Sequence, residues 1–117
     1  LPVAFSMNTP GYSEMIEMMG GHGAGSDKII QAQALKDATM AESISNNIEK
    51  NAIFVHINGD FHSANYGGIY WYLKILKPKL NVKTIKVYSE SNLNFNPDFK
   101  GTGDIILVVP EDFTKTH

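Results

Sequence analysis

Residues 52–72 read AIFVHINGDFHSANYGGIYWY and indicate how the chain folds. The apolar run 52–57 predicts a buried strand, and the aromatic stretch that starts at Gly67-Gly68 predicts a helix. A strand, a loop and a helix in this order form the basic unit of α/β proteins, in which ligands bind beyond the carboxyl ends of the strands. The polar loop between the two elements carries His62, so this loop is the first place to expect a site.

The rest of the chain alternates helical and strand-like patterns. The clearest helix is expected from about 27 to 50, where apolar residues recur at a spacing of three and four: Ile30, Ala34, Met40, Ala41, Ile44 and Ile48. Shorter elements are expected as helices at 12–19 and 68–76, and as strands at 3–7, 82–88 and 104–109. We therefore predict an α/β fold, with a mostly parallel sheet and flanking helices and with the last two strands antiparallel at an edge.

The composition is that of an ordinary globular chain. Its 117 residues suffice for one domain with a buried core, so residues 1–117 are predicted to form a single α/β unit. The net charge is −2 and arginine is absent, which argues against nucleic-acid binding. Without cysteine there is no disulfide or thiolate metal site, and no apolar run reaches the roughly 18 residues of a membrane span. The apolar start, Leu1 to Phe5, leads us to expect part of a larger domain.

Two histidines and one aspartate are candidates for chemistry. His62 follows the predicted strand, and imidazole is both a common metal ligand and a general base; the alternative is a loop histidine bonded to the backbone. His22 lies among glycines and would meet a ligand only if its loop closed. Asp37 falls on the apolar stripe of the long predicted helix, where a carboxylate is costly unless it is paired or ligated. The alternative is that the edge of this stripe is solvated.

Tyrosines supply a second group of candidates. Tyr66 and Tyr70 belong to the aromatic cluster around the glycine pair, and Tyr12 lies beside a methionine-rich segment. A tyrosine phenolate can be an axial haem ligand, and methionine side chains suit a flat apolar ligand. Helical aromatic residues at this density also serve as ordinary core packing, so the two interpretations stay open.

Two motifs resemble one known family. Residues 33–44, QALKDATMAESI, are similar to a helix of the ChaN-like haem-binding proteins. Residues 56–62, HINGDFH, followed by Gly67-Gly68, are similar to the strand, loop and helix of the same family. The similarity covers most of residues 1–110 and extends to the wider superfamily of TIKI, TraB and erythromycin esterase-like proteins.

The resemblance implies a haem-binding protein of bacterial haem and iron acquisition that binds without turnover. It further implies a homodimer and a lipoprotein at the cell envelope, on the outer membrane or the surface, whose lipid anchor lies outside this chain. In the family a tyrosine ligates haem iron, with histidine and lysine near the propionates. The residues expected to contact haem are therefore Tyr12, His22, His62, Tyr66 and Tyr70.

The superfamily also offers an alternative, a divalent-metal-dependent hydrolase. TIKI-type metalloproteases carry G-x-x-H motifs, and residues 59–62 fit one of them. In this interpretation His62 and Asp37 lie around a metal ion, and the remaining ligands come from sequence outside the chain.

Overall fold

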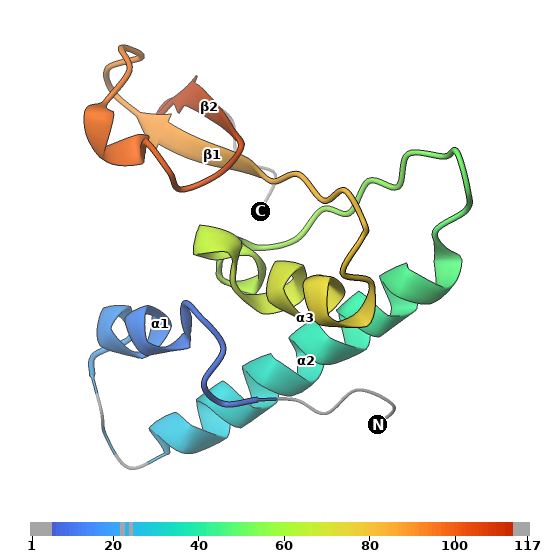
Figure 1. Cartoon of the computed structure of the whole chain (residues 1–117). Coiled ribbons are helices and arrows are strands. Elements are labelled where there is room, and N and C mark those ends of the chain that lie inside the picture. The colour runs from blue at the N-terminus through green and yellow to red at the C-terminus, as the bar shows by residue number, and fades with distance from the viewer. Residues whose placement is uncertain (1–5, 22, 24, 114–117) are drawn as a thin grey trace. The chain divides into compact units, whose positions relative to one another are not determined.

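The computed structural model describes residues 6–21, 23 and 25–113. The chain divides into two compact units, Leu1–Val82 and Lys83–His117. Helices make up the first unit and a small sheet makes up the second (Figure 1).

The first unit is built on a pair of packed helices. It contains α1 (Tyr12–Met18), α2 (Ser26–Asn47) and α3 (Gly68–Leu76), with short 3-10 turns at Asp60–His62 and Ala64–Tyr66. Helix α3 lies across α2 (Figure 1), and the buried contact between them consists of Ala38, Ala41, Ile44, Ile69, Tyr72 and Leu73. Because alanine has a short side chain, the two helices can approach closely at this contact. The helices predicted at 12–19, 27–50 and 68–76 are thus present, although α2 ends earlier than expected.

The second unit contains a two-stranded parallel sheet. Strand β1 (Ile85–Glu90) pairs with β2 (Ile105–Pro110), with Ile85 opposite Ile105. The predicted antiparallel pairing of these strands is wrong. Parallel strands need a connection of about a dozen residues or more, and the segment 91–104 is long enough for that crossover.

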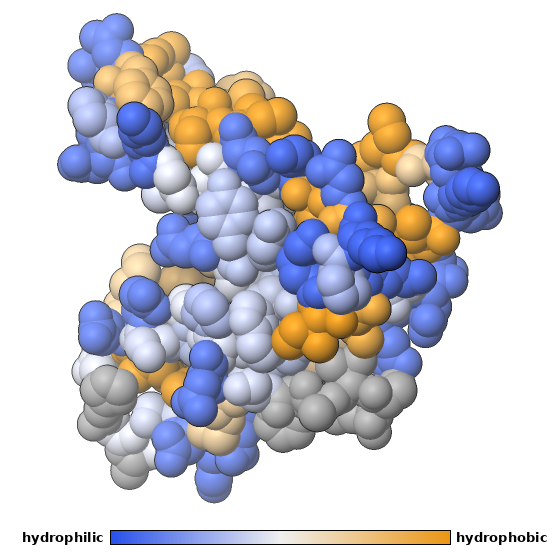
Figure 2. All heavy atoms as spheres, viewed as in Figure 1, coloured by the Kyte–Doolittle hydropathy of each residue, from blue (hydrophilic) through white to orange (hydrophobic). Residues whose placement is uncertain are grey.

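Both strands carry apolar side chains to the surface. Ile85, Val87, Ile105 and Leu107 are all exposed, and Figure 2 shows hydrophobic residues gathered over this sheet. Elsewhere in the second unit, the Tyr88 ring stacks on Phe99 with centroids 3.7 Å apart.

Helices together with a parallel sheet confirm the predicted mixed α/β class.

The segment 52–57 is not a strand, which corrects the expectation drawn from its apolar run. It is extended but pairs with no strand in the described part of the chain, and Ile53 and Ile57 are 93% and 91% exposed. An extended segment becomes a strand only when a neighbour satisfies its backbone donors and acceptors.

Two further expectations concern a strand near the N-terminus and membrane-spanning helices. Of the strand predicted at 3–7, residues 3–5 lie outside the described residues, and residues 6 and 7 are not in a strand. Within the described ranges, no helix has both the length and the apolar character needed to cross a membrane.

Candidate functional site

Asp37 is a buried carboxylate at the centre of the first unit. Its position on α2 places it among the alanines that face the interior, and it is 0% exposed. One carboxylate oxygen, Oδ1, lies 2.5 Å from Nδ1 of His62, and the other, Oδ2, accepts a 2.7 Å hydrogen bond from the hydroxyl of Tyr12. Of the two alternatives for Asp37, the structure shows the buried and paired one. No buried side-chain nitrogen or oxygen among the described residues lacks a partner.

Gln33 holds the loop that carries His62. Its Nε2 donates to the carbonyl oxygen of Phe61 at 3.3 Å and lies 2.8 Å from Nδ1 of His62. A ring nitrogen carries either a proton or a lone pair, so Nδ1 can serve only one of its two neighbours at a time. A charged carboxylate at 2.5 Å favours the form in which Nδ1 bears the proton and donates it to Asp37.

Burial dominates the acid–base properties of this cluster. Desolvation raises the pKa of Asp37 above its usual range, and the hydrogen bonds from His62 and Tyr12 oppose that rise. The pKa of the Tyr12 phenol is also raised, first by burial and then by its hydrogen bond to Asp37. The Tyr12 hydroxyl therefore stays protonated and acts as a donor to the carboxylate.

Two glycines allow the loop to reach Asp37. Gly68 has a φ of +50°, and a Cβ there would lie 2.2 Å from the carbonyl oxygen of His62 and 2.9 Å from Oδ2 of Asp37. A Cβ on Gly67 would lie 1.9 Å from the carbonyl oxygen of Pro10. Any larger residue at either position would push the His62 loop or the Pro10 segment away from the helices.

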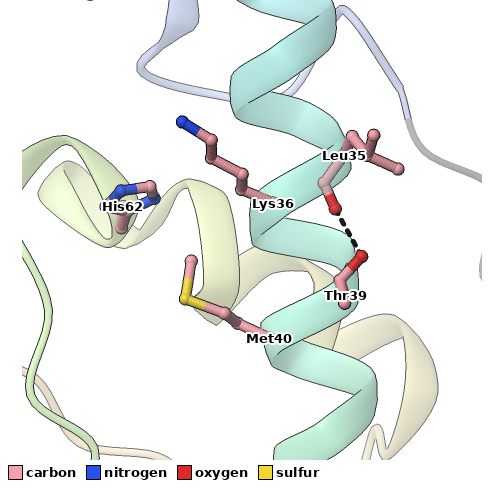
Figure 3. A pocket seen from close by; sticks show the side chains of 5 residues that line it. All are labelled: Leu35, Lys36, Thr39, Met40 and His62. Atoms are coloured by element: carbon pink, nitrogen blue, oxygen red, sulfur yellow. Dashed lines mark hydrogen bonds between the residues drawn. The ribbon is translucent and has the colours of Figure 1, made fainter.

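His62 lines an open hollow on the surface of the first unit. The hollow measures about 380 Å³ and is lined by Leu35, Lys36, Thr39, Met40 and His62. Figure 3 shows Lys36 and Met40 extending from α2 towards the side on which His62 lies. The His62 side chain is 25% exposed, and no described residue forms a hydrogen bond with its Nε2. With Nδ1 committed to Asp37, Nε2 keeps a lone pair that can bind an electrophile or a metal ion.

The other predicted site residues take different places. Tyr12 is buried, and its hydroxyl donates to Asp37. Tyr66 and Tyr70 pack edge to face, with ring centroids 5.1 Å apart, and neither lines the hollow. His22 lies outside the described residues. The structure thus brings together Asp37, His62 and Tyr12.

Several residues of the site were not predicted as site residues from the sequence. Gln33 and Met40 lie four residues before and three residues after Asp37, and Lys36 lies four residues before Met40. Residues three or four apart share a helix face, so this spacing was the available signal. It becomes informative only when Asp37 is already known to lie beside a functional loop.

For the metal-ion alternative, the structure gives a specific geometry. His62 and Asp37 contact each other directly, and both carboxylate oxygens of Asp37 are hydrogen-bonded. Within the described ranges, no group of three or more histidine, aspartate or glutamate side chains is placed to hold a metal ion.

Comparison with known proteins identifies the family. The family model described as haem-binding uptake, Tiki superfamily, ChaN matches residues 1–73. No curated protein and no solved structure is significantly similar to the chain. The family match includes α2, the His62 loop and most of α3, which together form the site. Since the match covers more than half of the sequence, the chain belongs to the ChaN family of haem-binding uptake proteins in the Tiki superfamily.

Proposed function

We propose that this protein binds haem for uptake, without turnover, and that Nε2 of His62 is the iron ligand. The observation that carries the proposal is the pairing of His62 with a fully buried carboxylate, which leaves Nε2 free beside an open hollow. Haem-ligating and metal-ligating histidines characteristically donate their other ring N–H to a carboxylate or carbonyl, which fixes the tautomer and the ring orientation. Asp37 performs this task for His62.

The lining of the hollow fits a flat apolar molecule with charged edges. Leu35 extends from α2 away from the side on which His62 lies (Figure 3). Met40 extends towards that side and offers apolar contact, and methionine adapts its shape to the surface it meets. Lys36 lies on the same side and forms no ion pair with a described acidic residue, so its ammonium is available to a propionate. When bound, haem supplies the iron centre and a large apolar surface, while the protein supplies the ligand, the contact surface and the countercharge.

None of the tyrosines is the iron ligand in this proposal. The Tyr12 hydroxyl is buried against Asp37, so Tyr12 holds the carboxylate rather than the iron. Tyr66 and Tyr70 remain predicted haem contacts, and neither lines the hollow. His22 stays a prediction from the sequence.

The wider biological role follows from the family. We propose bacterial haem and iron acquisition, a homodimer, and a lipoprotein at the cell envelope that is anchored through sequence outside this chain. The resemblance of residues 33–44 and 56–62 to ChaN-like proteins supports this role. The exposed apolar segment 52–57 is a surface of the kind that protein contacts cover.

A haem titration followed by visible absorption tests the proposal. Wild type is expected to bind haem saturably, and His62→Ala is expected to lose most of the affinity and to change the Soret band. His56→Ala is the matched control, because His56 is an exposed histidine that forms no part of the hollow. Identical titrations of wild type and His62→Ala would remove His62 as the ligand, and no saturable binding by wild type would remove the haem proposal.

The hydrolase alternative rests on the same pair. A histidine oriented by aspartate, with a free Nε2, is also the arrangement of a general base. Metal-stimulated hydrolysis of an ester or a peptide, lost in His62→Ala, would support this alternative, and it stays a prediction.

A further inference from the structure

We propose that Asn58 is a site of spontaneous deamidation, and that this modification releases the loop that carries His62. Of the asparagines in the sequence, Asn58 alone is followed by a glycine. In an Asn-Gly pair, the backbone nitrogen of the glycine can attack the side-chain amide, because the glycine has no side chain to hinder the approach. The reaction needs no ligand, and it does not depend on which residue binds iron.

The surroundings of Asn58 leave the attacking nitrogen accessible. Gly59 is exposed, and no described residue accepts a hydrogen bond from its N–H. The side-chain nitrogen Nδ2 of Asn58 donates to the carbonyl oxygen of Gly59 at 2.8 Å, so the amide is folded along the chain onto the residue that supplies the nucleophile. Residues 52–59 belong to neither a helix nor a strand, so no regular secondary structure holds the backbone against the small change that ring formation requires.

The reaction consumes water and no other reactant. The nitrogen of Gly59 forms a bond to Cγ of Asn58 while the bond from Cγ to Nδ2 breaks. The amide proton of Gly59 joins the departing NH2 group, which leaves as ammonia, and a succinimide ring remains. Water then adds to one of the ring carbonyls and gives aspartate or isoaspartate at position 58. Either product carries a carboxylate, so the protein becomes one unit more negative than its formal charge of −2.

The modification removes hydrogen bonds that hold the loop together. Besides its bond to Gly59, Nδ2 of Asn58 donates to the hydroxyl oxygen of Ser63 at 2.9 Å. A carboxylate has no proton to donate, and beside the carbonyl oxygen of Gly59 it meets repulsion instead of attraction. Isoaspartate, in addition, lengthens the main chain by one carbon atom at this position.

His62 lies within the turn that these hydrogen bonds close. Its backbone N–H donates to the carbonyl oxygen of Gly59 at 3.0 Å, and its ring is paired with the buried Asp37. A displaced Gly59 therefore moves the backbone of His62, and the pairing with Asp37 is expected to break. Deamidation would in this way convert an ordered site into a disordered one at a rate set by the local sequence.

Peptide mapping of the aged protein tests the modification. Wild type is incubated without haem at mildly alkaline pH, because removal of the Gly59 amide proton promotes the attack, and the products at each asparagine are identified by mass spectrometry. Aspartate and isoaspartate should accumulate at position 58 faster than at any other asparagine. Conversion at Asn58 that is no faster than elsewhere, or that does not occur, would overturn the proposal.

Gly59→Ala tests the nucleophilic attack. The backbone accepts this change, because Gly59 has a φ of −64° and an added Cβ would lie 3.8 Å from the nearest side-chain atom of His62. The added methyl group hinders the approach, so conversion should slow about tenfold, which corresponds to about 1.4 kcal/mol in the barrier. Gly23→Ala is the matched control, since Gly23 is exposed with open space around it, and its conversion rate should equal that of wild type. Equal rates in Gly59→Ala and wild type would overturn the mechanism.

The release of the loop is measured on the modified protein itself. The extra negative charge allows anion exchange to separate the deamidated fraction from the unmodified protein of the same preparation. The deamidated fraction should unfold at a lower urea concentration, and Asn58→Asp should show a shift in the same direction. Asn51→Asp is the matched control, because Asn51 is exposed in the same unit, and its midpoint should equal that of wild type. Equal midpoints for the two fractions would overturn the release of the loop.

These outcomes are distinct from those of the proposed function. Mass and unfolding midpoint are read without haem, so failure of wild type to bind haem would leave the deamidation site standing. A deamidated fraction with a lowered midpoint and an unchanged affinity for haem would support the deamidation site and count against His62 as a haem ligand.

Discussion

Asp37 lies in the buried stripe of α2, with each of its carboxylate oxygens bonded to a side chain from another part of the first unit. The sequence singled out Asp37 and His62 separately, the first for its place on an apolar stripe and the second for its loop. Their contact could not be read from the spacing, because it depends on how α3 and the loop pack on α2. Gln33 and Lys36 were not predicted as site residues for the same reason.

The raised pKa of Asp37 predicts a specific pH dependence of stability. Because the folded protein holds the Asp37 proton more tightly than the unfolded chain does, the contribution of this group is full below the ordinary carboxyl pKa of about 3.9. It falls as pH rises through the higher folded value. The free energy of unfolding of wild type, relative to that of Asp37→Asn, should therefore decrease from pH 4 towards neutrality in urea titrations. Parallel pH profiles of the two proteins would contradict the assignment.

Gly68 predicts a strong local effect of adding one methyl group. Gly68→Ala places a Cβ against the His62 carbonyl in a left-handed conformation, so it should destabilise the protein by about 2 kcal/mol or more and weaken haem binding. Gly59→Ala is the matched control, since Gly59 has a φ of −64° and its added Cβ would lie 3.8 Å from the nearest side-chain atom of His62. Chemical denaturation measures the free energy of unfolding of the two variants. Equal stability of the two variants would show that the loop tolerates displacement.

At the scale of elements, helices were predicted better than strands. The periodicity in 27–50 reports directly which face of α2 is buried, because a helix satisfies its own backbone hydrogen bonds. A strand depends on a partner that its own residues do not specify. The apolar run 52–57 therefore looked like a strand although no described strand pairs with it, and the orientation of β1 and β2 was predicted wrongly.

The exposed segment 52–57 yields a prediction about association. Ile53→Lys combined with Ile57→Lys replaces two of the most exposed apolar side chains. We expect the thermal stability of the helices to change little, by about 0.5 kcal/mol or less, and self-association in sedimentation velocity to decrease. Loss of the helical signal on this double substitution would show that both isoleucines are buried in the folded protein.

At the scale of the whole molecule, the family match and the site lie together in one unit. Residues 1–73 match the family, and the buried cluster, the hollow and the glycine pair all lie within Leu1–Val82. The sheet of Lys83–His117 confirms the α/β class but contributes no residue to the hollow. The single α/β unit predicted for residues 1–117 stays a prediction.

The resemblance to the ChaN family was recognisable because each of its motifs, in α2 and in the His62 loop, is a continuous stretch of sequence. The family model confirms it. The nature of the iron ligand was not recognisable in this way. The resemblance implied a tyrosine ligand, for which the sequence offered Tyr12, Tyr66 and Tyr70 beside His62 as haem contacts. In the structure the Tyr12 hydroxyl is bonded to Asp37, and His62 pairs with the same carboxylate.

The identity of the iron ligand is tested most directly by resonance Raman spectroscopy of the ferrous haem complex, prepared with histidine of natural abundance and with histidine labelled with heavy nitrogen. An iron–histidine stretching band that shifts on labelling, and that disappears in His62→Ala but persists in His56→Ala, is the predicted result. A band that is insensitive to the label, or that survives in His62→Ala, would contradict histidine ligation by His62.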